Sequence, residues 1–392
     1  MNSKELIQLH DQYVMSTYGR YPVALESGRG AVAVDMDGKE YVDFGSGIGA
    51  NSLGYCDAGW VKAVTEQLGK IQHGSNYYYN QPSALAAQKL CEVSGYDKLF
   101  FCNSGAEANE CAIKIARKYS FDKYGKGRAT IVSLKNSFHG RTVTTLSATG
   151  QDEFHRYFYP FTEGFAYAAP RMDEVEKALD GSVCAVMLEF IQGEGGVIPL
   201  EQEFVSQLFE TCRKRDILVL ADEVQTGVGR TGTFYCFEQY GVRPDVATSA
   251  KGLGAGLPIG VCLCSKELSG VLSAGTHGST FGGNPVVCAG ALEVLNRVSE
   301  PNFLNEVQAK GMYLRNRLED INAVESVRGK GLMLGAMLKD GTLTAKEAAA
   351  RCLEKGLFVL TAKTALRFLP PLTISYEELD RGATILEEVL GG

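Results

Sequence analysis

The sequence predicts an α/β protein with a mainly parallel sheet, helices on both of its faces, and a separate, smaller α+β unit. Two observations lead to this prediction. Short apolar runs, often β-branched, alternate with helix-like stretches between about residues 98 and 265, and such alternation is typical of parallel sheets. Beyond about residue 300 the pattern changes to a long amphipathic helix followed by short strands, which indicates a second unit.

The elements of the large unit follow in chain order. The expected strands are 99–101, 129–132, 184–188, 217–221, 245–247 and 259–264, and the expected helices are 106–118 and 204–214. In the second unit we expect a helix over 303–320, strands over 324–328, 335–338 and 367–369, and a helix from Thr344. A hairpin signal at 31–34 and 40–43 suggests that the N-terminal segment joins this unit. The predicted division is an N-terminal segment 1–50, a large domain 51–285 and a small domain 286–392.

The composition narrows the class of protein. With 392 residues, 45% hydrophobic and 22% charged, the chain is typical of a globular protein of two or three domains. A net charge of −7 argues against nucleic acid as the main partner. The first residues carry no apolar secretory signal and no stretch is long enough for a membrane span. Eleven cysteines without a C-x-x-C pair predict free, mostly buried thiols in a reducing cytoplasm.

Lys251 and Asp222 are the most informative pair of residues. Asp222 ends the apolar run 217–221, and Lys251 lies in the Gly-rich turn 249–254. An acid at a strand end can keep a pyridinium nitrogen protonated, and a lysine in such a turn can form a Schiff base. Together they are the pair that pyridoxal phosphate (PLP) requires of a protein.

Two turns that follow strands carry candidate cofactor contacts. Ser104, Gly105 and Ala106 open a helix, where free N–H groups can hold a phosphate; a capping box between Ser104 and Glu107 is the compatible, plainer interpretation. In the second turn, 136–141, Phe138 can stack on a planar cofactor or simply anchor the core. Arg141 can bind a carboxylate through two parallel hydrogen bonds. His139 lacks the companion spacing of a zinc ligand.

Three further segments carry polar groups that leave alternatives open. The turn 189–196, with Glu189 and Glu194, either lines a pocket or is solvated. The hydroxyl-rich turn 276–285 either donates to a phosphate or only reverses the chain. Arg367 lies in an apolar strand and needs an anion, from a neighbour or from a ligand.

A dinucleotide site is the competing interpretation. Gly227, Gly229 and Gly232 form a literal G-x-G-x-x-G after a strand. However, 234–237 does not open a helix, and no second strand ends in an acid about 20 residues further on, as the dinucleotide fingerprint requires. A dinucleotide-dependent oxidoreductase is therefore the less favoured alternative.

Six segments, taken together, resemble the class III (ω-amino acid) aminotransferases, and within that family the members that act on acetylornithine. The segments are N-S-G-A-E-A-N, F-H-G-R, Q-G-E-G-G, D-E-V-Q-T-G-x-G-R-T-G, A-K-G-L-G and H-G-S-T-F-G-G-N-P, in the family's order, within a similarity spanning about residues 21–390. The resemblance implies PLP as cofactor and fold type I, with a seven-stranded sheet and a small domain built from both termini. It also implies a cytoplasmic homodimer with active sites at the subunit interface.

The resemblance also implies residue roles. Lys251 would form the Schiff base and then act as acid and base, and Asp222 would hold the ring nitrogen. The remaining cofactor contacts would be Ser104, Gly105, Ala106, Phe138, His139, Val224, Gln225 and, from the other subunit, Thr280. Arg141, Ser279, Glu194 and Arg367 would contact substrates, with Glu194 pairing with Arg367 when no α-carboxylate needs it. No metal is expected.

The implied reaction transfers the terminal amine of N-acetylornithine to 2-oxoglutarate, giving N-acetylglutamate semialdehyde and glutamate in arginine biosynthesis. The alternative donors are N-succinyldiaminopimelate, ornithine, succinylornithine and 4-aminobutyrate. Two departures from the family pattern bear on this choice: Phe190 replaces a common proline, and 54–58 reads G-Y-C-D-A where the family commonly has G-H-x-H-P. A non-catalytic scaffold is a third possibility, although a scaffold needs neither Lys251 nor Asp222.

Overall fold

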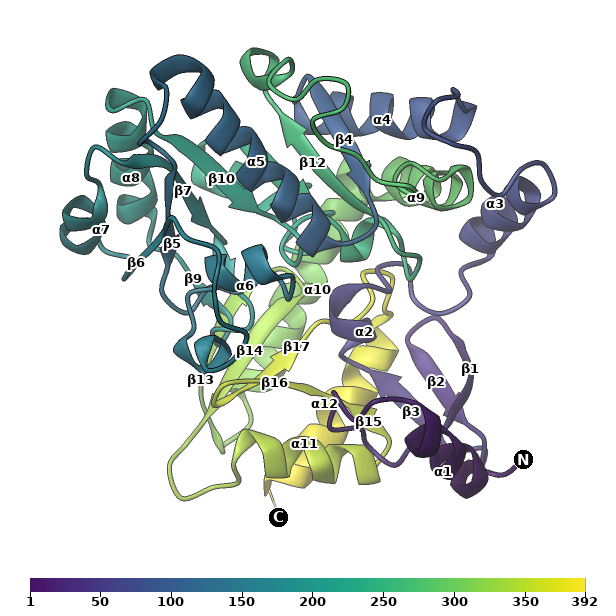
Figure 1. The fold of residues 1–392 in the computed structure, drawn as a ribbon. Coiled ribbons are helices and arrows are strands. Elements are labelled where there is room, and N and C mark those ends of the chain that lie inside the picture. Colours follow the sequence, from purple (N-terminus) through teal and green to yellow (C-terminus); the bar gives the residue numbers. More distant parts are fainter. Residues whose placement is uncertain (392) are drawn as a thin grey trace.

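The computed structural model describes residues 1–391 and is built around a seven-stranded sheet (Figure 1). Its strand order is β4 (Lys98–Cys102), β12 (Gly260–Cys264), β11 (Val246–Ser249), β10 (Leu218–Asp222), β7 (Val183–Leu188), β5 (Thr130–Leu134) and β6 (Phe165–Ala168). Only β12 runs antiparallel to its neighbours; the other pairings are parallel. The predicted mainly parallel sheet of seven strands is therefore confirmed.

Side chains on this sheet alternate between two core layers. Ala185 and Met187 of β7 pack in the layer under α5 (Gly105–Tyr124), whereas Val186 and Leu188 pack in the layer that includes α8 (Gln202–Lys214). This alternation is the period-two pattern of a strand that is covered on both faces. It explains why the strand reads as a continuous apolar run.

The second unit contains an antiparallel sheet of β13 (Val324–Lys330), β14 (Met333–Leu338), β17 (Ala365–Phe368) and β16 (Leu360–Ala362). Its helices are α10 (Pro301–Glu319), α11 (Ala345–Glu354) and α12 (Tyr376–Gly391). Thr344, where we expected a helix to begin, is the N-cap of α11. The expected α+β character of this region is confirmed.

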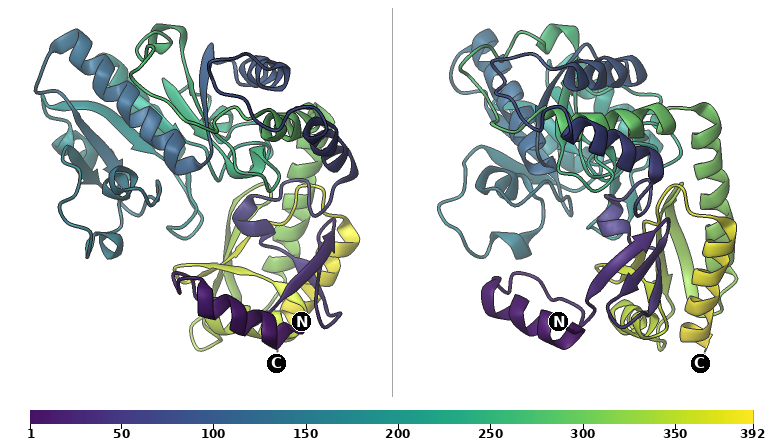
Figure 2. Two further views of the ribbon diagram at one scale, coloured as in Figure 1. Left: turned by 45° about the vertical axis from the view of Figure 1, so that its right-hand side comes forward. Right: turned by 90° about the vertical axis from the view of Figure 1, so that its right-hand side faces the viewer.

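The two ends of the chain meet in one sheet. The N-terminal strands β1 (Leu25–Arg29), β2 (Val32–Asp35) and β3 (Glu40–Asp43) are extended by β15 (Leu357–Phe358), which pairs in parallel with β3. The helix α1 (Ser3–Tyr13) has no buried residue and lies at the rim of this unit (Figure 2).

Several elements were not predicted. They are the helices α1, α3 (Ala58–Leu68), α4 (Gln81–Ser94), α9 (Pro285–Val298) and α12, the strands β1, β6, β15 and β16, and the short segments α2 (Ser46–Gly49), α6 (Val143–Ala148), α7 (Met172–Ala178), β8 (Ile191–Gln192) and β9 (Ile198–Pro199). Helix α9 packs on α3 and α4, beside the large sheet. The domain division at 50/51 and 285/286 stays a prediction.

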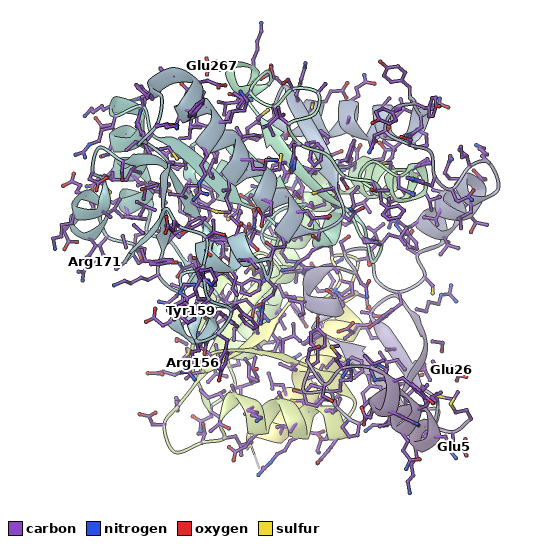
Figure 3. All side chains as sticks on the ribbon, in the orientation of Figure 1. Glu5, Glu26, Arg156, Tyr159, Arg171 and Glu267 are labelled. Carbon is purple, nitrogen blue, oxygen red and sulfur yellow. The ribbon has the colours of Figure 1, made fainter. Side chains whose placement is uncertain are left out.

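The surface and the cysteines agree with the composition. Charged side chains such as Glu5, Arg171 and Glu267 are exposed and project outward (Figure 3). All eleven cysteines are free, and most are buried, as the sequence predicted. Within residues 1–391, no helix is both long and apolar enough to cross a membrane.

Candidate active site

A cavity of about 450 Å³ opens where β5, β7 and β10 end. The carboxyl ends of parallel strands are where open α/β sheets bind their ligands. The cavity is lined by Ser104, Gly105, Ala106, Asn109, Phe138, His139, Arg141, Glu189, Asp222, Val224, Gln225 and Lys251, together with Ala50, Asn103, Gly140, Ala250 and 256–259. Most of the predicted site residues, which are distant in sequence, are thus brought together.

Lys251 opens the short 3₁₀ turn Lys251–Leu253 that follows β11. Its φ of +42° is uncommon for a residue with a side chain, and such strain is found mainly at functional sites. Burial lowers the pKa of Lys251 below the usual lysine value, while the nearby charge of Glu194 opposes this shift. A lowered pKa favours the neutral amine, the only form that can act as a nucleophile.

Asp222 is fixed by three donors at the end of β10. Its Oδ2 lies 2.8 Å from Nδ1 of His139 and accepts from Nδ2 of Asn109 at 2.8 Å, and its Oδ1 accepts from the N–H of Val224 at 3.0 Å. Asn109 is oriented in turn by Thr248, whose hydroxyl donates to its Oδ1 at 2.6 Å. These contacts hold the carboxylate in a single orientation at the cavity wall.

The turn before α5 leaves donors free for an anion. Ser104 is the N-cap, and its Oγ accepts from the N–H of Glu107, so the predicted cap is present. Gly105 and Ala106 are the first two helical residues, whose N–H groups have no partner within the helix. A Cβ on Gly105 would lie 2.7 Å from Cγ1 of Val224. Only glycine therefore keeps this corner of the cavity open.

Phe138 and Arg141 lie on the loop after β5. Phe138 lines the cavity and meets Phe154 edge-on, with ring centroids 5.8 Å apart. The guanidinium of Arg141 lies 4.4 Å from the centre of the Phe154 ring and 5.5 Å from that of Phe138. The cation is exposed at the cavity rim, where it can meet a carboxylate that enters from solvent.

Arg367 finds its anion in Glu194. Its Nη1 donates to Oε1 of Glu194 at 2.5 Å and to Oε1 of Gln225 at 3.3 Å, and the arginine is only 3% exposed. Burial alone would raise the pKa of Glu194, but the Arg367 guanidinium, together with Lys251 and Gln225, more than offsets burial and lowers it. Because Gln225 also lines the cavity, the ion pair lies directly behind the cavity wall.

Besides Glu194 and Arg367, which lie behind the cavity wall, two predicted site residues do not line the cavity of the single chain. Ser279 lies next to it, since its Oγ accepts from Nδ2 of Asn103 at 3.1 Å. Thr280 is exposed. The role implied for Thr280, contact with the cofactor of another subunit, stays a prediction.

Sequence reasoning missed the partners that hold the site residues. Asn109 donates to Asp222 and is itself oriented by Thr248. The ring of Phe154 packs against the guanidinium of Arg141. Asn109 offered one signal, because it lies one helical turn after Gly105 and so shares a helix face with it. Thr248 and Phe154 offered none, since their contacts depend on strand order and loop packing.

The glycine-rich segment 227–232 does not form a dinucleotide site. Its residues are buried, and a Cβ on Gly227 would lie 2.8 Å from the ring of Tyr235. The next element is the 3₁₀ turn Cys236–Tyr240 rather than a helix that opens at the third glycine. This segment packs the core, and the oxidoreductase interpretation has no support from it.

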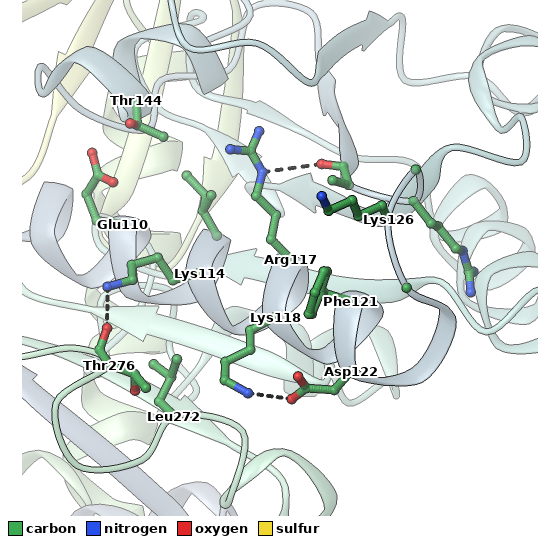
Figure 4. A pocket seen from close by; sticks show the side chains of 15 residues that line it. Glu110, Lys114, Arg117, Lys118, Phe121, Asp122, Lys126, Thr144, Leu272 and Thr276 are labelled. Carbon is green, nitrogen blue, oxygen red and sulfur yellow. Dashed lines mark hydrogen bonds and ion pairs between the residues drawn. The ribbon is translucent and has the colours of Figure 1, made fainter.

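A larger hollow, of about 810 Å³, lies on the outer side of α5 (Figure 4). Volume alone would favour it as a site, but most of its cations already have partners. Lys114 donates to the carbonyl of Thr276, Lys118 pairs with Asp122, and Arg117 donates to the carbonyl of Ala129. Nothing in this hollow matches the lysine and acid of the smaller cavity.

Comparison with known proteins gives a consistent family. Residues 13–390 match the family model described as aminotransferase class-III. The chain is 49% identical to the acetylornithine aminotransferase of Haemophilus ducreyi over 100% of this chain and 99% of that protein. It is 42% identical to the one from Methanocaldococcus jannaschii, over 99% of this chain and 98% of that protein.

Solved structures agree. The N-acetylornithine aminotransferase of Stenotrophomonas maltophilia superimposes with a TM-score of 0.85 at 35% identity, covering 98% of both chains. The ornithine aminotransferase of Toxoplasma gondii gives a TM-score of 0.94 at 31% identity, covering 99% of this chain and 95% of that one. With the lysine, the acid and the arginine–glutamate pair gathered at one strand-end cavity, these matches show that the chain belongs to the class-III aminotransferases.

Proposed function

We propose that this chain transfers the terminal amine of N-acetylornithine to 2-oxoglutarate, giving N-acetylglutamate semialdehyde and glutamate, with PLP as cofactor. The Glu194–Arg367 pair behind the Lys251 cavity carries this proposal. Such a site must bind two substrates in turn, and only one of them places an α-carboxylate at this position. It therefore needs a cation, here Arg367, whose charge an acid can neutralise when that carboxylate is absent. The names of the relatives in Haemophilus ducreyi and Stenotrophomonas maltophilia support the choice of donor.

The residues present fit PLP. The glycine at position 105 keeps open a corner that a Cβ would fill, next to the free N–H groups at the start of α5, which suit a phosphate. Phe138 and Val224 would lie against the ring, Gln225 and His139 at its edge, and Asp222 at its nitrogen. When bound, PLP supplies an electron sink for the carbon that loses a proton.

The chain's own residues would supply binding and proton transfer. Nζ of Lys251, with its lowered pKa, is suited to take a proton from a substrate carbon and return it elsewhere. Arg141, exposed at the rim, would bind the α-carboxylate of N-acetylornithine. Arg367 would bind that of 2-oxoglutarate after Glu194 swings away, because an arginine binds a carboxylate through two parallel hydrogen bonds.

Ornithine and the other ω-amines remain the alternative donors, and the likeness to the ornithine aminotransferase of Toxoplasma gondii favours ornithine among them. Phe190, the departure nearest the site, bears on this choice. Its ring is fully buried and packs 5.0 Å from that of Tyr240. Phe190 therefore belongs to the core and is not among the residues that line the cavity.

We further infer that the protein is a cytoplasmic homodimer. Tyr77, Tyr78, Tyr79 and Phe281 form an exposed aromatic surface, with exposed fractions of at least 59%. Asn76 ties the two segments together, since its Nδ2 donates to the carbonyls of Ser279 and Gly282. An apolar surface of this kind marks an interaction site, and a second copy would bring Thr280 toward the partner's cavity. Free thiols suit a reducing compartment.

The first experiment is a visible spectrum of the purified protein with added PLP, titrated with N-acetylornithine, ornithine and 4-aminobutyrate in the absence of keto acid. We expect a visible cofactor band that N-acetylornithine removes at the lowest concentration. A band that responds better to another amine would move the substrate and keep the reaction class. A protein without a band would overturn the proposal.

A further inference from the structure

Glu189 is a buried acid that forms no ion pair within the described part of the chain. It directly follows β7 and is 5% exposed, and among the ion pairs of residues 1–391 none includes it. A carboxylate withdrawn from water costs free energy unless hydrogen bonds or charges compensate it. The proposed function assigns no role to Glu189, and its hydrogen-bond partners indicate one.

The two oxygens of Glu189 hold two different loops. Oε1 accepts from the N–H of Phe138 at 2.8 Å, and Oε2 accepts from the N–H of Gly193 at 3.3 Å. The first loop follows β5 and carries the ring proposed to lie on the cofactor. The second is the turn that carries Glu194. Because β5 and β7 are neighbours in the sheet, both loops come within reach of one side chain.

We propose that Glu189 is a positioning residue that fixes the Phe138 loop and the Glu194 turn relative to each other. This proposal rests on the proposed function. One side chain would set both the surface against which the cofactor ring lies and the resting place of the acid that masks Arg367. The cofactor plane and the substrate switch would then share a common support.

The charges around Glu189 agree with such a role. The pKa of Glu189 is raised to about 7, mainly by burial; the Asp222 carboxylate contributes to this rise, whereas His139 and the two backbone N–H groups oppose it. Lys251 also feels the charge of Glu189. The ionised form accepts from both loops, whereas a protonated oxygen would point its own hydrogen at an N–H group. Both bonds are therefore made best when Glu189 is charged.

Glu223 provides a matched control. It too is a fully buried glutamate whose pKa burial raises to about 7, and it accepts from the N–H of Phe237 at 2.9 Å and from the hydroxyl of Thr226. Neither of these donors lines the cavity. Glu189→Gln and Glu223→Gln thus make the same chemical change in equally buried positions, and only the first touches the two site loops.

The experiment compares the two variants with the wild type. An amide has one acceptor oxygen, so Glu189→Gln must lose one of its two bonds. We expect its PLP dissociation constant, measured by fluorescence quenching, to rise about fivefold, the equivalent of one hydrogen bond. The visible circular dichroism of bound PLP should weaken and the KM for 2-oxoglutarate should rise. Glu223→Gln should keep the wild-type dichroism and PLP affinity.

Each outcome decides something. If Glu189→Gln binds PLP with wild-type affinity and dichroism, the positioning role is wrong, whereas the proposed function stands as long as the wild type binds PLP. If the wild type itself fails to bind PLP, the proposed function is wrong. Should Glu189→Gln not fold, Glu189→Asp keeps the charge but cannot reach both loops, and the same changes are expected of it; unchanged PLP affinity and dichroism in Glu189→Asp would also overturn the role.

Discussion

Lys251 carries two unfavourable features in one residue. Its positive φ costs about 1–3 kcal/mol, and its amine is withdrawn from water, which lowers its pKa. A smaller or uncharged side chain at this position would remove the cost of burying the amine. Such a residue persists when its chemistry is needed, and that need can be tested separately from the fold.

We expect Lys251→Ala to abolish transamination and to leave the fold and the subunit assembly intact, because the variant removes the amine without disturbing a packed apolar side chain. Turnover assays and gel filtration check both parts. Lys266→Ala, at an exposed lysine, is the control and should keep wild-type activity. Substantial turnover by Lys251→Ala would exclude Lys251 as the cofactor-bonding residue.

A second residue-scale prediction concerns the pH dependence of stability. Burial raises the pKa of Glu223 from 4.5 to about 7, so the folded protein keeps this proton at pH values where the unfolded chain has lost it. The contribution of Glu223 to stability is therefore full below about pH 4.5 and is lost as the pH rises to about 7, a change of about 3 kcal/mol.

Glu223→Gln cannot titrate and should lack this loss. Relative to the wild type, the variant should gain about 3 kcal/mol in free energy of unfolding between about pH 4.5 and about pH 8. Denaturant titrations of both proteins across this range measure the difference. A difference that does not change with pH would contradict the assignment.

At the scale of elements, the position of the first turn of α5 depends on Gly105 having no Cβ. A Cβ at residue 105 would lie 2.7 Å from Val224, and relief would push Val224 away from the cavity wall or tilt the first turn of the helix. We expect Gly105→Ala to lower PLP affinity at least tenfold, which a PLP titration followed by fluorescence measures. Gly181→Ala, where a Cβ meets no atom within 4 Å, should bind PLP normally; equal affinities for the two variants would exclude this explanation.

How well each element could be predicted follows from its surroundings. Strand β7 is buried on both faces, so its residues form an unbroken apolar run that sequence reasoning recognises. Strand β6 lies at the sheet edge and three of its four residues are partly or fully exposed, so it has neither a long run nor a regular alternation. Helix α4 has only three buried residues, and its apolar stripe is correspondingly weak.

The candidate site divides in the same way. Motifs gave the positions of Lys251, Asp222 and Gly105, because their neighbours in sequence carry the signal. They did not give Thr248 as the residue that orients Asn109, since that contact requires β11 beside β10 and α5 above both. The residues proposed to contact the cofactor were thus predictable from motifs, and the residues that orient them were not.

At the scale of the whole molecule, the exposed aromatic surface predicts assembly. Tyr78→Glu places a charge within it, and we expect this variant to become a monomer with weakened PLP affinity, because Thr280 would no longer reach a second cavity. Analytical ultracentrifugation and PLP titration measure the two effects. Met312→Glu, at an exposed methionine on α10, should remain a dimer. A dimeric Tyr78→Glu protein would show that the interface lies elsewhere.

The pairing of β3 with β15 has a consequence for synthesis. Val42 lies beside Leu357, and at about 5–20 residues per second the roughly 315 residues between them take on the order of 15–60 s to emerge from the ribosome. During that interval the edge of β3 has no strand to pair with, and unpaired edges attract other chains. The N-terminal strands therefore cannot complete their sheet until the C-terminal part of the chain has been synthesised. A chain that stops before residue 357 would leave the ribosome with the edge of β3 unpaired and prone to aggregation.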